Sequence, residues 1–266
     1  MIANYHTHTA RCNHAVGTER DYIEQGIANG LQVLGFSDHA PYLFNDPDGY
    51  YSNMRMRPEE FRDYCDTLTA LREEYRGRID IRIGLEMEYY PAHFHRTLQW
   101  MQDFPLDYLI LGQHFLGNEK GCRYCGGRTD DEAVLKQYVD QVIEGLHTGC
   151  FTYLAHPDLP AFTGSDRVYA RHMTRLCETM HALDIPAELN LLGLMQGRAY
   201  PSRRFWRIAA ETGCRCVLGC DAHTPTATAE PTIIAEAMDA LAQFGLTPVE
   251  TLPLKDPFAA LYTKKD

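Results

Sequence analysis

The chain has 266 residues, of which 45% are hydrophobic and 23% charged, and its formal net charge is −11. This size and apolar content suffice for one barrel-sized core, so we expect a single domain over residues 1–266. A chain this acidic is a poor candidate for the dense basic surface that nucleic-acid binding needs, and it has no basic run that would favour an anionic membrane, so we expect neither partner. The negative charge is compatible with a small anionic substrate, because bound metal ions can reverse the local field.

Residues 1–6 lack the basic and apolar regions of a signal peptide, and no segment approaches the roughly 20 apolar residues of a membrane span. We therefore expect a cytoplasmic protein without disulfides. The nine cysteines fit this expectation, because most of them fall in apolar segments. Cys122 and Cys125 form one C-x-x-C pair, which on its own is a weak indication of metal or redox chemistry.

Seven short apolar runs alternate with longer segments of helical periodicity. The runs are continuously apolar, as in strands buried on both faces of a parallel sheet. In chain order, the expected strands are residues 3–6, 32–39, 79–88, 106–114, 151–156, 186–194 and 215–221. The expected helices are residues 18–29, 58–75, 91–101, 130–147, 165–183, 202–212 and 231–244.

Local signals support the helix boundaries. Gly30 follows the first helix and is a favourable stop, whereas Pro58 opens the second. The alternation of strands and helices predicts a closed or nearly closed α/β barrel with seven units, one fewer than the standard eight. An open doubly wound sheet is the alternative. The longest expected loop, residues 41–57, contains several aromatic side chains and is expected to cover a site.

Six of the seven expected strands end in, or run directly into, a histidine or a carboxylate. These residues are His6 and His8, Asp38 and His39, Glu86 and Glu88, His114, His156, and Asp221 and His223. The sixth strand ends near Asn190, which is a poor metal ligand. The carboxyl ends of parallel strands meet on one face, so these side chains should lie close together. Histidine with carboxylate is a ligand set for zinc, manganese or iron.

Residue spacing adds to this interpretation. His6 and His8 lie two residues apart on a strand, so their side chains leave on the same face. Carboxylates and imidazoles that face one another in a buried place need a partner, and metal ions would supply it. Five other histidines are expected to be structural or surface residues: His93, His95, His147, His172 and His181.

These motifs resemble those of the PHP family, the polymerase-and-histidinol-phosphatase metal-dependent phosphoesterases. The resemblance spans residues 3 to about 225 in the order of the family's motifs. It rests on His6-Thr7-His8-Thr9, Cys12-Asn13-His14, Ser37-Asp38-His39, Gly84-Leu85-Glu86, Gln113-His114, Ala155-His156-Pro157 and Cys220-Asp221-Ala222-His223. It implies a distorted seven-unit (βα)7 barrel, similar to a TIM barrel, with two to three divalent metal ions (Zn, Mn or Fe) at the C-terminal strand ends.

The resemblance also implies how the ligands divide among the metals. One metal would be bound by His6, His8, Glu86 and Asp221, a second by Glu86 as a bridge with His114 and His156, and a third by His14, His39 and His223. Glu86 is preferred over Glu88 because it aligns with the family motif. Asp38 would either assist proton transfer or orient a ligand, and we favour orientation.

Within the family, the chain is most similar to the monofunctional histidinol-phosphate phosphatases. Two stretches support this, Asn53-Met54-Arg55-Met56 and Gly197-Arg198-Ala199-Tyr200-Pro201-Ser202. Glu88 departs from the aspartate expected of relatives, and we expect little consequence. The implied reaction is hydrolysis of L-histidinol phosphate to L-histidinol and phosphate by a metal-bridging hydroxide, with Arg198 as a phosphate clamp. Tyr42 or Phe44 could pack on the substrate imidazole.

Two alternatives remain at this point. The first keeps the metals and changes the substrate, as in a phosphoesterase or nuclease of the same family that acts on another phosphorylated metabolite or a nucleotide. The second is a non-catalytic metal-binding regulatory protein. The apparently complete ligand set disfavours the second alternative, because a member that had lost activity would be expected to lose ligands.

Overall fold

The computed structural model describes residues 1–262, in which seven parallel strands form one sheet in the order β1 to β7. The strands are β1 (Ala3–Asn4), β2 (Val33–Phe36), β3 (Asp80–Met87), β4 (Tyr108–Leu111), β5 (Phe151–Leu154), β6 (Ala187–Asn190) and β7 (Cys216–Gly219). Just beyond β1 and β7, Thr7 and Ala222 form an isolated parallel bridge. The sheet is therefore a nearly closed barrel and not an open doubly wound sheet.

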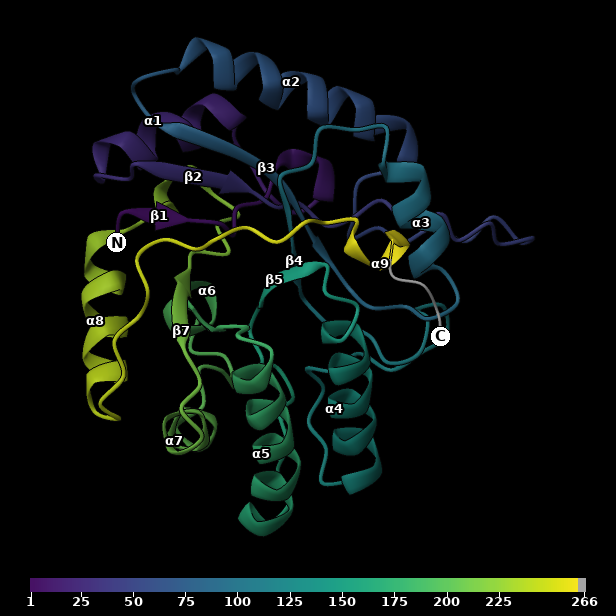
Figure 1. The fold of residues 1–266 in the computed structure, drawn as a ribbon, viewed down its shortest axis with the longest axis vertical. Coiled ribbons are helices and arrows are strands. Elements are labelled where there is room, and N and C mark those ends of the chain that lie inside the picture. Colours follow the sequence, from purple (N-terminus) through teal and green to yellow (C-terminus); the bar gives the residue numbers. More distant parts are fainter. Residues whose placement is uncertain (263–266) are drawn as a thin grey trace.

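Helices surround the barrel, and most of them fall within the expected ranges (Figure 1). They are α1 (Glu19–Ala28), α2 (Phe61–Glu74), α3 (Phe94–Met101), α4 (Glu132–Leu146), α5 (Asp166–Ala182), α6 (Leu191–Met195), α7 (Arg203–Glu211), α8 (Pro231–Ala242) and α9 (Ala259–Tyr262), with short 3-10 helices η1 (Ala10–Cys12), η2 (Pro58–Glu60) and η3 (Pro225–Ala227). Thr18 and Asp21 form a reciprocal capping box at the start of α1. None of the helices within residues 1–262 has the length and apolar character needed to cross a membrane.

The sixth expected strand, residues 186–194, differs from the structure. The strand ends at Asn190, and α6 begins at Leu191. Asn190 caps this helix, because its Oδ1 accepts a hydrogen bond from the backbone N–H of Gly193 at 2.8 Å. A short apolar run has the same composition in a buried strand and in a buried helix, which is why periodicity did not separate the two.

The inside of the barrel is filled by side chains. Tyr108 lies at its centre, and its hydroxyl donates hydrogen bonds to the carbonyls of Tyr5 (2.7 Å) and Phe36 (3.1 Å). Gly84 makes room for this ring, since a Cβ there would lie 2.4 Å from it. Leu252, from the segment that follows α8, packs into the same interior cluster. The filled interior leaves the C-terminal strand ends as the open face.

The nine cysteines are free, as expected. Cys214, Cys216 and Cys220, around β7, are buried in the core. In the C-x-x-C pair, Cys122 is exposed and Cys125 is buried. The pair lies in the loop after β4.

Candidate metal centre

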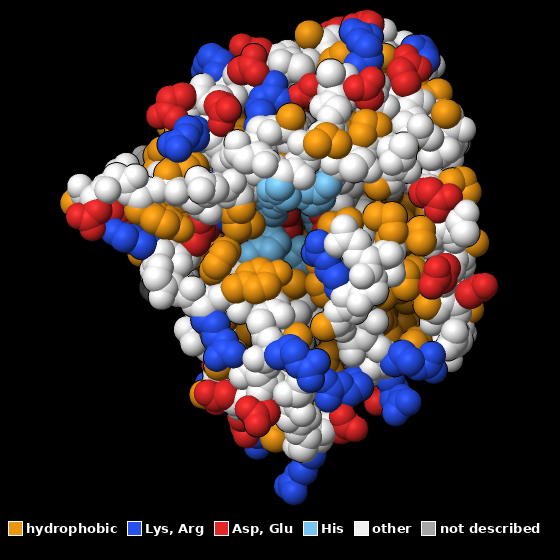
Figure 2. All heavy atoms as spheres, turned by 180° about the vertical axis from the view of Figure 1, so that it is seen from behind, with side chains coloured by type: hydrophobic (Ala, Val, Ile, Leu, Met, Phe, Trp, Pro, Cys, Tyr) orange, Lys and Arg blue, Asp and Glu red, His pale blue; other side chains and the backbone are white. Residues whose placement is uncertain are grey.

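The strand-end residues gather around one cavity of about 290 Å³ at the C-terminal end of the barrel. Figure 2 shows histidine side chains at the bottom of a hollow on this face. The cavity is lined by His14, His39, Met54, Glu86, His114, Tyr124, His156, Leu192, Gln196, Arg198, Tyr200, Asp221 and His223. Six loops that follow different strands therefore contribute to one site, as expected for a parallel barrel.

The first predicted ligand set surrounds one oxygen of Glu86 and one of Asp221. The Nε2 atoms of His6 and His8 both lie 3.5 Å from Glu86 Oε2. They lie 3.5 Å and 3.0 Å, respectively, from Asp221 Oδ1. All four residues are buried. The structure thus brings these four side chains together around one point.

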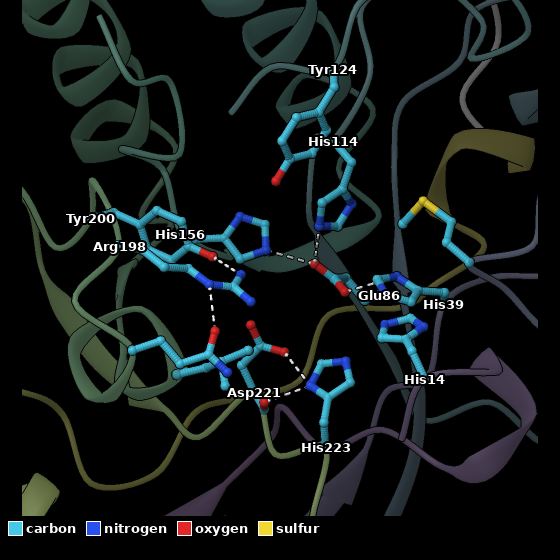
Figure 3. Close-up of a pocket in the computed structure, with 13 residues that line it drawn as sticks. His14, His39, Glu86, His114, Tyr124, His156, Arg198, Tyr200, Asp221 and His223 are labelled. Carbon is cyan, nitrogen blue, oxygen red and sulfur yellow. Dashed lines mark hydrogen bonds and ion pairs between the residues drawn. The ribbon is translucent and has the colours of Figure 1, made fainter. Parts of the chain in front are cut away.

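The other oxygen of Glu86 faces the second predicted set. His156 Nε2 lies 2.8 Å and His114 Nε2 3.6 Å from Glu86 Oε1. Figure 3 shows both rings directed at this carboxylate. Because its two oxygens face different imidazoles, Glu86 is placed where it could bridge two cations.

The third predicted set lies on the solvent side of the first. The ring of His14 stacks on those of His39 and His223, with centroids 5.4 Å and 4.7 Å away. Nδ1 of His14 hydrogen bonds to the carbonyl of Cys12 (2.7 Å), and Nδ1 of His223 to that of Asp221 (2.9 Å). These bonds leave Nε2 of both rings available to a ligand.

Two residues of the cluster have strained backbone. His156 has a φ of 31° and Asp221 a φ of 49°, in the left-handed region that non-glycine residues rarely adopt. Such a conformation costs on the order of 1–3 kcal/mol and persists where the surroundings fix it, typically at functional sites. At both positions the sharp turn after the strand directs a side chain into the cavity.

Carboxylates outside the cavity orient two of the histidines. Glu188, in β6, contacts His6 Nδ1 at 3.0 Å, which leaves His6 Nε2 facing Glu86 and Asp221. Asp38 lies 3.5 Å from His8 Nδ1 on the side away from the cavity. Asp38 also accepts hydrogen bonds from Thr9, does not line the cavity, and is fully buried. Its position suits the orientation of a ligand and not proton transfer to a substrate.

Glu188 is not among the site residues predicted from the sequence. Asn190 is the residue expected at the end of the sixth strand, and Glu188 lies two positions earlier and points to the same face. A signal was present, because Glu188 is a carboxylate inside a continuously apolar strand, and a buried charge needs a partner.

The electrostatics of the cluster favour a cation. Burial lowers the pKa of the His6 imidazole, but Glu188, Asp221 and Glu86 outweigh burial and raise it to about 10. Burial, helped by the positive charge of His8, lowers the pKa of His39 to about 4. The carboxylates thus hold protons on some imidazoles while others stay neutral. A metal would displace those protons, so its affinity should rise with pH.

The donor atoms also fit a metal. Nε2 of His6, His8 and His223 and Nδ1 of His39 are buried without a hydrogen-bond partner in the described part of the chain. Leaving such an atom unsatisfied costs about 1–3 kcal/mol, so several of them at one place indicate a missing ligand. Imidazole nitrogens and carboxylate oxygens together suit zinc, manganese and iron. The side chains therefore fit divalent metal ions.

Arg198 lies at the rim of the cavity, in the turn after α6. Its Nη1 donates a hydrogen bond to the Tyr200 hydroxyl (2.6 Å), and its Nε donates one to Gln196 Oε1 (2.9 Å). No carboxylate within residues 1–262 forms an ion pair with this guanidinium. Arg198 is therefore held by neutral groups beside the histidine cluster (Figure 3) and keeps its charge available for an anion.

The expectation for Tyr42 and Phe44 is wrong. Neither residue lines the cavity. Tyr42 is fully buried, and both rings face the guanidinium carbon of Arg55, at 5.5 Å and 5.9 Å. The aromatic side chains that do line the cavity are Tyr124 and Tyr200. The loop over residues 41–57 contributes Met54 to the lining instead.

The five histidines expected to be structural or surface residues do not line the cavity: His93, His95, His147, His172 and His181. Two of them have partners elsewhere. His172 Nε2 contacts Glu132 at 3.0 Å between α4 and α5, and His181 Nδ1 bonds to the carbonyl of Gly213 at 2.9 Å. These contacts give them structural roles away from the site.

Comparison with known proteins gives a family match and two similar relatives. Residues 4–191 match the PHP domain family. A Deinococcus radiodurans protein named probable histidinol-phosphatase is 31% identical over 247 residues, which cover 84% of this chain and 87% of the relative. The histidinol-phosphatase of Bacillus subtilis is 30% identical over 151 residues, 54% of this chain and 52% of the relative.

The fold matches a solved structure as well. Histidinol phosphate phosphatase from Lactococcus lactis, solved with zinc, L-histidinol and phosphate, superimposes with a TM-score of 0.73 at 18% identity, over 96% of this chain and 98% of the other. At that identity the likeness shows the fold alone. The match over residues 4–191 and the 31% identity to the D. radiodurans relative show that this chain belongs to the PHP domain family.

Proposed function

We propose that the protein is a metal-dependent phosphomonoester hydrolase that converts L-histidinol phosphate and water to L-histidinol and phosphate. One observation carries the proposal: seven histidine and carboxylate side chains line one cavity, with His6 and His8 in contact with two of them, and the same cavity has an arginine without an ion-pair partner among residues 1–262 at its rim. The substrate assignment is supported by the relative from D. radiodurans, which is named for this activity and aligns with 84% of the chain.

The proposed ligands form three sets around the cavity. We propose that His6, His8, Glu86 and Asp221 bind one divalent ion, that Glu86 with His114 and His156 binds a second, and that His14, His39 and His223 bind a third. When bound, such ions would acidify the attacking water and offset negative charge on the phosphoryl oxygens. Zinc, manganese and iron all suit these ligands.

The remaining residues of the cavity act on the substrate. Arg198 stands where its guanidinium could bind phosphate oxygens in a two-pronged fashion. Tyr124, Met54 and Leu192 add apolar surface to the cavity lining, suited to the carbon skeleton and imidazole of the alcohol product. Glu188 and Asp38 keep His6 and His8 turned toward the cavity.

The test of the function is turnover by the metal-loaded protein. Histidinol phosphate should be hydrolysed with a kcat/KM far above those for other phosphomonoesters and for nucleotides in a matched panel. A preference for a nucleotide or another phosphorylated metabolite would contradict the proposed substrate but would still support metal-dependent phosphoester hydrolysis. The absence of any metal-dependent hydrolysis would contradict both.

Metal content is a prediction of its own. Protein purified without chelator should contain about two to three divalent ions per chain, one for each of the proposed ligand sets. Dialysis against EDTA should lower the Tm by roughly 5–10 °C, because a metal at a hundred times its Kd stabilises the folded state by about 2.7 kcal/mol. Elemental analysis and calorimetry on the same samples measure both effects. A metal-free protein with full activity would contradict the whole assignment.

Arg198 provides a second prediction. Arg198→Ala should lower kcat/KM for histidinol phosphate by on the order of ten- to a hundred-fold, the loss of a charge-assisted contact worth about 1.5–3 kcal/mol. Arg198→Lys should recover only part of this, since an ammonium group cannot bind two oxygens in the same plane. Metal content should stay constant in both variants. Wild-type kcat/KM in Arg198→Ala would mean that the phosphate is held by the metals and other groups alone.

A further inference from the structure

A buried ion cluster lies directly behind the metal centre, outside the cavity. Arg55, from the loop over residues 41–57, donates two hydrogen bonds to Glu88, both of 3.1 Å. Its Nη2 also donates to Glu119, from the loop after β4. Arg55 and Glu88 are fully buried, and Glu119 is 2% exposed. A fully buried arginine with two carboxylates is costly to desolvate, so its presence calls for a reason other than stability.

Glu88 connects this cluster to the metal centre. Its Oε1 lies 3.0 Å from Nδ1 of His114, while Nε2 of the same ring faces Glu86 across the cavity. Nδ1 of His114 therefore contacts Glu88, which does not line the cavity, whereas Nε2 faces the proposed ligand Glu86. A carboxylate on Nδ1 fixes the proton on that nitrogen and leaves the Nε2 lone pair for a metal.

The net charge of the cluster also favours metal binding by His114. One guanidinium faces two carboxylates, so the buried group has one surplus negative charge next to His114. Hydrogen bonds from Tyr50 (3.1 Å) and Tyr90 (2.8 Å) to Glu119 stabilise that carboxylate but bring no positive charge. Negative charge behind an imidazole raises its basicity as a metal ligand. The arginine keeps Glu88 in place, because it grips both of its oxygens in a fixed plane.

We infer that Glu88, clamped by Arg55 against Glu119, is a positioning residue that sets the tautomer and the ring orientation of His114 for metal binding. The inference deepens the proposed function and rests on it for the link to turnover. It gives Arg55 the role of holding Glu88, and it gives the aromatic residues Tyr42 and Phe44 the role of covering Arg55. Glu88 was expected to matter little, and these contacts assign it a place in the site.

The experiment compares Glu88→Gln with the wild type and with Glu132→Gln. Glu132 is a matched control, because it also contacts a histidine nitrogen at 3.0 Å (His172 Nε2) but lies between α4 and α5, away from the cavity. Chelated apo-protein is titrated with Zn²⁺ in competition with a chromophoric chelator, and the Tm of each apo-protein is recorded. Glutamine keeps the shape of Glu88 and removes its charge.

We expect Glu88→Gln to lower the zinc affinity of one site by about ten- to a hundred-fold and to leave the affinities of the other sites unchanged. Glu132→Gln should bind zinc as the wild type does. Wild-type affinity at every site in Glu88→Gln would overturn the inference. So would a loss of all equivalents in parallel with a fall in apo Tm, since that pattern belongs to a residue that only supports the fold.

A measurement on the wild type guards against a variant that fails to fold. In zinc-loaded protein with ¹⁵N-labelled histidine, the His114 signals, assigned by their loss in His114→Gln, should show the proton on Nδ1 and the metal on Nε2. The opposite assignment would overturn the inference. Neither measurement uses a substrate. A protein that binds zinc in this way without hydrolysing histidinol phosphate would therefore contradict the proposed function alone.

Discussion

Glu86→Gln should reduce kcat/KM by roughly a hundred- to a thousand-fold or more and should remove at least one metal ion from the protein. The reason is the position of Glu86. Its two oxygens lie within 3.6 Å of imidazole nitrogens from five histidines, namely His6, His8, His39, His114 and His156. The substitution keeps the shape of the side chain but takes away the negative charge that two proposed cations would share.

Steady-state kinetics and elemental analysis on the same preparations measure this effect, and His114→Ala should give a loss of similar kind. His147→Ala and His181→Ala are the controls, because both residues lie outside the cavity. Nearly unchanged kinetics are expected for them. Equal losses in the two groups would contradict the placement of the site, and full metal content with full activity in Glu86→Gln would contradict the role of Glu86 as a bridge.

Gly112→Ala should be nearly as damaging, although glycine has no functional group to lose. Gly112 follows β4, and a Cβ at this position would lie 1.9 Å from Glu86 Oε1 and 2.6 Å from Glu86 Cδ. Glu86 cannot move aside cheaply, because it is 1% exposed and surrounded by imidazoles. We expect the carboxylate to be displaced by on the order of an ångström, which can lower the rate by about a hundred-fold.

Metal titration and kinetics check the prediction for Gly112→Ala, and circular dichroism shows whether the fold is kept. Overpacking of this kind costs about 1–3 kcal/mol, which a domain of this size should tolerate. Gly127→Ala is the control, since the nearest atom to an added Cβ there is 3.4 Å away, an ordinary contact. A Gly112→Ala variant with wild-type metal affinity would show that Glu86 has more freedom than its surroundings indicate.

The barrel could be predicted from the sequence, because a parallel sheet covered by helices needs apolar runs that alternate with amphipathic segments. The prediction was wrong where a strand and the helix that follows it form one continuous apolar run. Leu191–Met195 forms a helix, although its composition continues that of β6. What ends the strand is the side chain of Asn190, which caps the backbone of the next turn. A local hydrogen bond of this kind leaves no trace in hydrophobic periodicity.

The proposed ligands could be located because they occupy equivalent places, directly after successive strands of one sheet. The residues behind them follow no such rule. Glu188 lies inside a strand, Glu88 after one, and Arg55 in a long loop. Tertiary contacts join Glu188 and Glu88 to the proposed ligands His6 and His114, and join Arg55 to Glu88. Spacing within the chain cannot show that Arg55 and Glu119, which lie 64 positions apart, share a hydrogen bond.

The segments that follow the first and last strands of the barrel meet at its C-terminal end. Thr7 and Ala222 form the bridge there, and His8 N–H donates to the carbonyl of Ala222 at 3.0 Å. His8 and Asp221, which would share a cation, stand on opposite sides of this seam. A bound ion would therefore cross-link the two ends of the sheet. Because it closes a loop that comprises most of the chain, it would restrict the unfolded ensemble as a long-range cross-link does. The residues that hold this ion for hydrolysis would then also join the first and last strands of the barrel.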